Sequence, residues 1–147
     1  MSTEQNSSNE CCLSKQYGNW CAGEDLSSYK NHEGKQYCIF HAPAEKKGIS
    51  RAEFNAKLFN RIEKAKRKNA ECDLSGTIFQ YHISFGSYKP SNPFPKVNFS
   101  KAQFESADFC GVSFAEETNF EKAVFLEGAD FRQASFLDNT NFSSTVF

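Results

Sequence analysis

The sequence predicts a mainly β fold in which very short strands alternate with corners and wind into a solenoid with square coils. The first observation is phenylalanine spacing: eleven rings recur every five or six residues from Phe94 to Phe147. Because a helix turns by about 100° per residue, a five-residue step would scatter the rings around it. A simple strand also fails, since five is odd and alternate rings would face opposite sides. A short strand followed by a corner lets every ring point at one axis.

The second observation is a small residue two positions before most rings, such as Ala102, Ala107 and Ala123. Residues two apart on a strand share a face, so the small residue and the ring point inward together. A short fixed period is typical of a solenoid, and the number of units predicts about three to four coils. The predicted core ladder is Leu74, Phe79, Phe99, Phe104, Phe109, Phe114, Phe120, Phe125, Phe131, Phe136, Phe142 and Phe147.

The repeat units resemble a known family. Ala107-Asp108-Phe109-Cys110-Gly111 and Cys72-Asp73-Leu74-Ser75-Gly76 are similar to the unit of pentapeptide repeat proteins. From Phe114 onward the steps alternate six and five, an eleven-residue double unit that some members of the family share. This resemblance covers 72–147 and implies a right-handed quadrilateral β-helix. It implies little about activity, because folds host diverse functions.

The remaining segments divide the chain further. Residues 1–10, rich in Ser, Asn and Gln, are expected to be a disordered tail. Residues 46–71 form a linker and a helix that starts at the capping box Ser50 to Glu53 and carries an apolar face. We expect this amphipathic helix to lie as a cap over the open end of the first coil. A surface loop containing two prolines is predicted at about 86–93.

Cysteines and a histidine gather in 11–45, which we interpret as a zinc-binding-like module. Cys38 and His41 have the Cys-x2-His spacing that lets both ends of a turn reach one ion. Cys12 and Cys21 are predicted to complete a tetrahedron, with Cys11 possible in place of Cys12. Four protein ligands leave no open position, so the zinc would be structural. The alternatives are a disulfide pair and unliganded thiols.

A second resemblance concerns the order of the segments. Tyr37-Cys38-Ile39-Phe40-His41-Ala42-Pro43, followed by a basic helix and Phe-rich repeats, looks like a bacterial subgroup of pentapeptide repeat proteins. That subgroup implies no particular activity.

Charge is distributed unevenly along the chain. Residues 50–70 carry seven basic residues and two acids, net +5, whereas 97–147 carry three basic residues and eight acids, net −5. Lys57, Arg61, Lys64 and Lys68 form one stripe on the helix. A solvated edge is the favoured interpretation of this stripe, and a phosphate-binding surface is the alternative.

Function is predicted from what the sequence contains and lacks. The chain has no Ser-His-Asp grouping and no phosphate loop, which favours a non-enzymatic scaffold that binds an unidentified protein. One alternative is a DNA mimic that binds a gyrase-like topoisomerase, and another is nucleic-acid binding through the basic helix. We expect a cytoplasmic protein, because the sequence has no membrane span and no secretory signal. A homodimer through the C-terminal coil is expected if that end pairs with a copy of itself.

Overall fold

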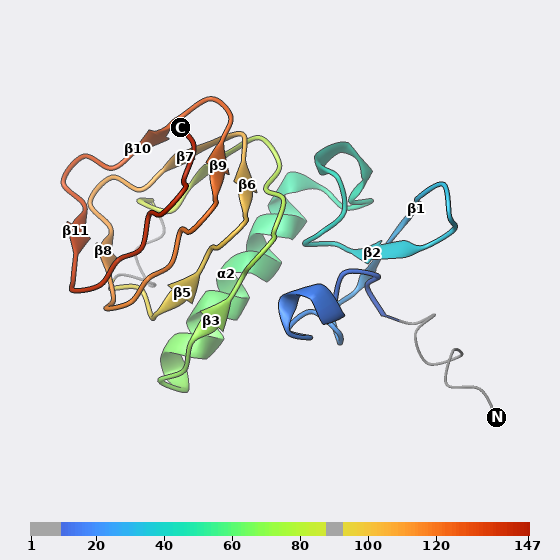
Figure 1. Cartoon of the computed structure of the whole chain (residues 1–147), viewed down its shortest axis with the longest axis horizontal. Helices are drawn as coiled ribbons and strands as arrows, with labels where there is room; N and C mark the ends of the chain where they lie inside the picture. The colour runs from blue at the N-terminus through green and yellow to red at the C-terminus, as the bar shows by residue number, and fades with distance from the viewer. Residues whose placement is uncertain (1–9, 88–92) are drawn as a thin grey trace.

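The computed structural model describes residues 10–87 and 93–147. Three parts follow one another across the molecule in Figure 1: a Cys/His module (residues 11–43), the helix α2, and a repeat region (residues 72–147). The helix lies between the other two parts, so its two sides contact different halves of the chain.

The Cys/His module is built mainly from turns around one small hairpin. Leu26 at the start of β1 pairs with Cys38 at the end of β2, and the two strands are antiparallel. The side chain of Asn31 closes the hairpin turn by accepting hydrogen bonds from the backbone N–H groups of Glu33 and Lys35. The elements of this part and its linker are η1 (Lys15–Tyr17), β1 (Leu26–Lys30), β2 (Gln36–Cys38) and η2 (Ala44–Lys46).

Helix α2 spans Arg51–Arg67 and begins at the predicted capping box, which is confirmed. Ser50 Oγ accepts from the Glu53 N–H at 3.1 Å, and the Glu53 carboxylate accepts from the Ser50 N–H at 3.3 Å. The apolar face is buried, and the Phe54 ring packs 5.6 Å from Phe40 of the module and 6.2 Å from Phe79 of the repeat region. The helix therefore joins the two parts through one continuous core. Among residues 10–87 and 93–147, no helix is long and apolar enough to cross a membrane.

The repeat region forms small parallel sheets whose partners are more than twenty residues apart in sequence. Phe104 pairs with Phe125, and Ala107 pairs with both Ile83 and Ala129. The strand orders are β10-β7-β4, β11-β8, β3-β5 and β6-β9. The strands are β3 (Cys72–Asp73), β4 (His82–Ser84), β5 (Val97–Asn98), β6 (Gln103–Phe104), β7 (Ser106–Asp108), β8 (Ser113–Phe114), β9 (Val124–Phe125), β10 (Ala129–Asp130) and β11 (Ser135–Phe136).

The prediction of a mainly β, right-handed quadrilateral β-helix of three to four coils is wrong. The described residues form a mixed fold of small sheets, each with two or three strands, together with one α-helix. Strands of the repeat region stay at two or three residues because the backbone leaves the extended region soon after each ring. The residue two positions after Phe99, Phe120 and Phe131 has a left-handed backbone, with φ of 59–60°. These corners end each ladder before a long sheet can form.

The five-residue spacing nevertheless aligns the phenylalanine rings in columns. Phe79, Phe104, Phe125 and Phe147 stack face to face, with centroids 4.3, 4.6 and 5.2 Å apart. Neighbouring columns meet edge to face, as Phe85 and Phe99 do at 78°. Ring packing, rather than a wide hydrogen-bonded sheet, therefore fills the core of this region.

Burial of the predicted core ladder declines along the chain. Its members from Leu74 to Phe125 are buried. Phe131 and Phe142 are half-buried, and Phe136 and Phe147 are 40% and 65% exposed. The prediction that Phe136 and Phe147 are core residues is therefore wrong. Each of these two rings stacks on one neighbouring ring and has no second ring stacked on its other face among the described residues.

Two predictions fall wholly or partly on residues that the structure does not describe. The disordered tail, 1–10, lies outside the described residues except for Glu10. Most of the predicted surface loop at about 86–93 also lies outside them, since 88–92 are not described.

Candidate metal centre

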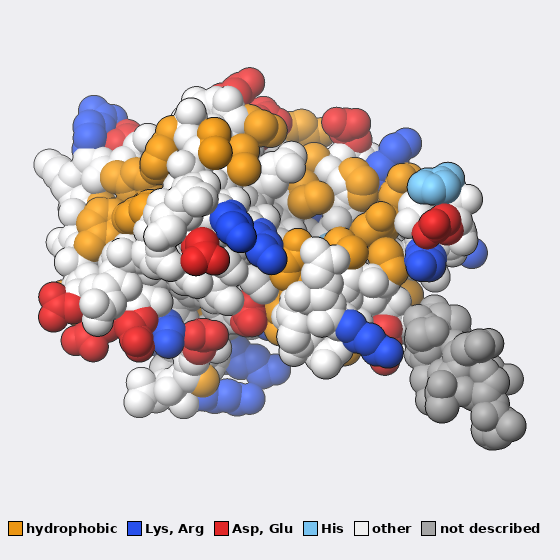
Figure 2. Space-filling model, viewed as in Figure 1, with side chains coloured by type: hydrophobic (Ala, Val, Ile, Leu, Met, Phe, Trp, Pro, Cys, Tyr) orange, Lys and Arg blue, Asp and Glu red, His pale blue; other side chains and the backbone are white. Residues whose placement is uncertain are grey.

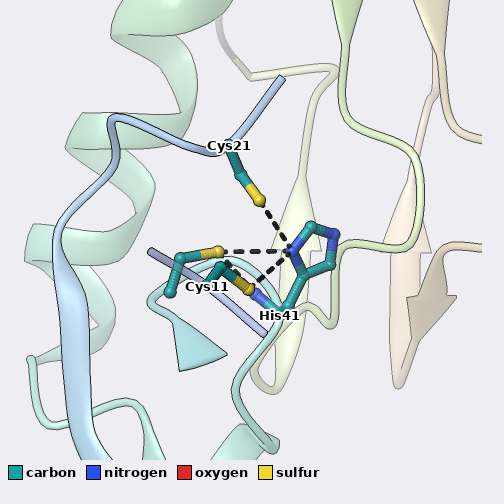
Figure 3. A group of neighbouring side chains, drawn as sticks. Cys11, Cys21 and His41 are labelled. Atoms are coloured by element: carbon teal, nitrogen blue, oxygen red, sulfur yellow. Dashed lines mark hydrogen bonds between the residues drawn. The ribbon is translucent and has the colours of Figure 1, made fainter. Parts of the chain in front are cut away.

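Three thiols and one imidazole meet inside the Cys/His module. The ligand atoms of Cys11, Cys21, Cys38 and His41 all lie within 4.8 Å of one another, and all four residues are buried. His41 Nδ1 lies 3.6 Å from the sulfur of Cys11, 3.4 Å from that of Cys21 and 3.3 Å from that of Cys38. Figure 3 shows the thiols of Cys11 and Cys21 turned toward this nitrogen.

Local turns aim these side chains at one point. The Ala42 N–H donates to the Cys38 carbonyl at 2.9 Å, which closes the turn that carries Cys38 and His41. Within this turn the His41 N–H also donates to Cys38 Sγ at 3.4 Å. The Leu13 N–H donates to Cys11 Sγ at 3.4 Å. Backbone N–H groups directed at the sulfurs stabilise thiolates, the form in which cysteine binds a metal.

The distances in this cluster match those of tetrahedral coordination. A tetrahedral zinc site, with Zn–S bonds of about 2.3 Å and Zn–N bonds of about 2.0–2.1 Å, separates a sulfur and a nitrogen ligand by about 3.5 Å. The three Sγ to Nδ1 separations, 3.3–3.6 Å, fall around this value. The sulfur-to-nitrogen distances therefore fit coordination of a single metal ion by these four residues.

Protons in the cluster are shared unequally. Hydrogen bonds with Cys21 and Cys38 lower the pKa of Cys11, whereas the hydrogen bond with Cys11 raises the pKa of Cys21. Burial alone would lower the pKa of His41, but hydrogen bonds with Cys11 and Cys38 outweigh it and raise that pKa to about 9. In the absence of a metal, these directions favour the thiolate at Cys11 and the protonated forms of Cys21 and His41.

A layer of contacts outside the cluster fixes the imidazole. Its other nitrogen, Nε2, lies 2.9 Å from the carbonyl oxygen of Ser75 in the repeat region. The Tyr17 ring stacks on the imidazole, with centroids 4.8 Å apart and planes 12° apart. The Trp20 ring lies 5.2 Å away at 59°. The hydrogen bond that Nε2–H donates to this carbonyl leaves Nδ1 facing the sulfurs, which is the orientation that metal binding needs.

Lys47 supports the ligand-bearing turn from inside the protein. It is 1% exposed, and its Nζ donates to the carbonyls of Ile39, Phe40 and Ala42 at 2.6, 3.1 and 2.9 Å. Burial lowers the pKa of Lys47 to about 7. The sequence gives no sign of this role, because Lys47 lies in a run of polar residues and only the fold shows that its side chain turns inward.

The structure places Cys11, not Cys12, in the cluster. The Cys12 side chain is exposed, so the prediction that Cys12 is a ligand is wrong and its substitute Cys11 takes the place. Adjacent residues in this turn point to different sides, and Cys11 is the one directed inward. All six cysteines are free thiols, and burial raises the pKa of Cys72, outside the cluster, to about 12.

Half of the predicted basic stripe contacts the Cys/His module. Lys57 forms an ion pair with Asp25 at 3.0 Å, and Arg61 pairs with Glu24. The Arg61 guanidinium also lies over the Trp20 ring, 4.6 Å from its centroid. The other two members of the stripe, Lys64 and Lys68, are exposed.

Comparisons with known proteins add no relative to this description. No protein-family model, no curated protein and no solved structure matches the chain. The resemblance to pentapeptide repeat proteins therefore stays a prediction.

Proposed function

We propose that this protein is a non-enzymatic scaffold whose Cys/His module is held together by one structural zinc ion. Cys11, Cys21, Cys38 and His41 would hold the ion. The observation that carries the proposal is the convergence of their four buried ligand atoms within 4.8 Å. Three thiolates and an imidazole form a donor set that zinc prefers, and a closed set of four protein ligands is typical of a structural site.

The Cys/His module has too small an apolar core to be stable without a further cross-link such as a metal ion. Apart from Leu13, Leu26 and Ile39 it contains few aliphatic residues, and its only described sheet is a two-stranded hairpin. A two-stranded hairpin is at best marginally stable alone, and small domains of this kind commonly depend on a metal. Zinc would link three separate turns of the module at one point.

Purification of the protein and measurement of its metal content per chain test whether an ion is bound. We expect about one zinc per chain, and replacement by Co²⁺ should give the visible absorption bands of a tetrahedral thiolate site. Cys11→Ser should reduce metal content strongly, whereas Cys12→Ser should retain it. These adjacent thiols form a matched pair, because they share a chain segment and differ in burial. A metal-free wild type, or loss of metal only in Cys12→Ser, would overturn the assignment.

The scaffold role is supported by the remainder of the molecule. The surface of the repeat region combines small and charged side chains with exposed hydrophobic residues such as Leu126, Leu137 and Val146, a mixture that suits contact with a protein partner. Affinity capture from cells, with wild type and Cys38→Ser compared, tests the role directly. Recovery of the same specific partner by wild type alone would link partner binding to the metal. Recovery of no specific partner would contradict a scaffold.

The two alternatives receive less support from the contacts. Nucleic-acid binding through the helix would require free basic side chains, but Lys57 and Arg61 are paired with acids of the module. A DNA mimic would use the acidic repeat region, and salt-sensitive protection of a gyrase-like topoisomerase would be its signature.

A further inference from the structure

His41 connects the metal cluster to the repeat region. One imidazole nitrogen faces the three sulfurs, and the other donates to the Ser75 carbonyl at 2.9 Å. The same carbonyl accepts the indole N–H of Trp20 at 3.2 Å. A backbone hydrogen bond from the Ile78 N–H to the Phe40 carbonyl, 2.8 Å long, closes the junction beside them. The cluster thus shares its outer contacts with residues that lie more than thirty positions further along the chain.

Gly76 packs closely against the Tyr17 ring at this junction. Its φ is +72°, and a Cβ at this position would lie within 2.6 Å of three carbons of the Tyr17 ring, Cζ, Cε1 and Cε2. Because all three carbons are nearly equidistant, the Gly76 backbone lies against the face of that ring. Tyr17 itself stacks on His41. Any side chain at position 76 would therefore push the Tyr17 ring, and with it the imidazole.

We propose that Ser75 and Gly76 of the repeat region are positioning residues for the metal centre. The Ser75 carbonyl orients the His41 imidazole, and the bare Gly76 backbone lets Tyr17 and His41 reach their stacked positions. This inference rests on the proposed metal binding. Carbonyl partners of a metal-bound histidine fix its orientation, and their loss typically weakens metal binding about 10- to 100-fold.

Metal binding and docking of the repeat region onto the Cys/His module must strengthen each other. If docking of the repeat region strengthens metal binding by some factor, metal binding strengthens the docking by the same factor. The ion would therefore stabilise the junction between the two halves of the chain as well as the module itself.

Gly76→Ala tests the proposal, because the chain offers a close control in Gly111. Both glycines lie two residues after an inward residue, and their φ values are +72° and +73°. The Gly76 N–H donates to the Ser100 carbonyl and the Gly111 N–H to the Arg132 carbonyl, each at 2.9 Å. A Cβ at Gly111 would meet nothing within 4 Å. Gly111→Ala therefore reproduces the backbone strain of Gly76→Ala without the contact to Tyr17.

The measurement is zinc affinity, by competition with a chromophoric chelator, for full-length wild type and both variants. We expect Gly76→Ala to bind zinc about 10- to 100-fold more weakly than wild type. Gly111→Ala should stay within about threefold of wild type. Equal affinities of the two variants, whether both unchanged or both weakened alike, would overturn the proposal while leaving the metal site intact. A wild type that binds no zinc would instead remove the proposed function and this inference with it.

A double substitution keeps the test informative if Gly76→Ala folds poorly. Tyr17→Ala removes the ring that the new methyl group would meet. Gly76→Ala should then cost much less zinc affinity in the Tyr17→Ala background than in wild type. The same loss in both backgrounds would show that contact with Tyr17 is not the cause.

Discussion

Lys47 shows how a single side chain can organise the ligand-bearing turn. Its ammonium group satisfies three backbone carbonyls, and it lies 4.7 Å from the centre of the Phe54 ring on α2. A buried cation is costly unless its donors are all used, and here the three donors of the ammonium have three acceptors. Lys47 therefore ties the turn between Cys38 and His41 to the helix behind it.

Replacement of Lys47 by methionine should destabilise the protein. The substitution keeps the approximate volume but leaves the buried carbonyls of Ile39 and Ala42 without a donor, while the Phe40 carbonyl keeps the N–H of Ile78. We expect this loss to cost about 2–4 kcal/mol of unfolding free energy. Urea denaturation followed by far-UV circular dichroism measures it. The neighbouring Lys46 is exposed, so Lys46→Met is the control and should change stability by less than about 0.5 kcal/mol. Equal stability of the two variants would contradict this account of Lys47.

Metal binding should depend on pH in a predictable direction. His41, with a pKa raised to about 9, and Cys21, whose pKa is also raised, hold protons near pH 7 that an ion must displace. Because protonation competes with the metal, apparent zinc affinity should rise from pH 6 to pH 8. The rise should reach up to about tenfold per pH unit for each proton displaced. Chelator competition across this range measures it, and an affinity that is flat or falls with pH would contradict the assignment.

The ligand residues differ in how far the sequence predicts them. Cys38 and His41 are predictable because their spacing is confined to one short turn. Cys21 follows from the need for further ligands. The choice between Cys11 and Cys12 depends on which of two adjacent side chains faces inward, and turn geometry rather than composition decides this. Ser75 was beyond prediction, because it acts through a backbone carbonyl that every residue possesses.

The ring columns of the repeat region are imposed by the backbone. Face-to-face stacking is not the arrangement that isolated aromatic rings prefer, because their quadrupoles repel. Parallel strands lie about 4.8 Å apart, however, and hold equivalent rings at nearly that spacing. Contacts between columns are edge to face, as between Phe109 and Phe120 at 84°, and these are favourable. The sheet spacing and the edge contacts together stabilise the columns.

Position within a column should therefore determine the effect of losing a ring. Phe109 is buried, with rings stacked on both sides, Phe85 at 4.7 Å and Phe131 at 4.9 Å. Phe109→Ala should cost about 3–5 kcal/mol. Phe147 is 65% exposed and stacks on Phe125 alone among the described rings, so Phe147→Ala should cost less than about 1 kcal/mol. Thermal or urea unfolding of the two variants would contradict this ranking if the losses were equal.

At the level of elements, the phenylalanine pattern predicted which side chains point inward but did not predict the fold class correctly. The repeat pattern correctly predicted the inward side chains of the ladder from Leu74 to Phe125, which are buried. It overestimated the extended backbone, because residues such as Lys101 and Lys122 adopt left-handed corners that side-chain patterning does not reveal. Helix α2 was predictable, since both its cap and its apolar face are local features of the sequence.

The whole molecule is arranged around α2, with opposite charges meeting on one side of it. Figure 2 shows acidic side chains gathered along the lower edge of the repeat region, and basic side chains near the lower end of the helix. Near the Cys/His module, the basic residues Lys57 and Arg61 are paired with its acids. The helix thus contacts the Cys/His module by ion pairs as well as by its buried face.

Self-association stays a prediction at this scale. Leu126, Phe136, Leu137, Val146 and Phe147 are exposed hydrophobic residues within 126–147, and Figure 2 shows hydrophobic side chains at the surface near β10 and β11. Apolar surface of this kind favours pairing with a copy through a two-fold contact. Light scattering should therefore give a dimer mass that falls to a monomer in the double variant Phe136→Lys, Phe147→Lys. A wild type that is monomeric at all concentrations would exclude the dimer.

The fluorescence of Trp20 can report on the junction between the Cys/His module and the repeat region. It is the one indole in the chain, and it contacts both the Arg61 guanidinium and the Phe40 ring, while its N–H donates to the Ser75 carbonyl. Excitation at a wavelength that only tryptophan absorbs would therefore report the state of this boundary, with no contribution from the phenylalanines that make up most of the core. Comparison of that emission with ellipticity during denaturation would show whether the two halves separate before either one unfolds.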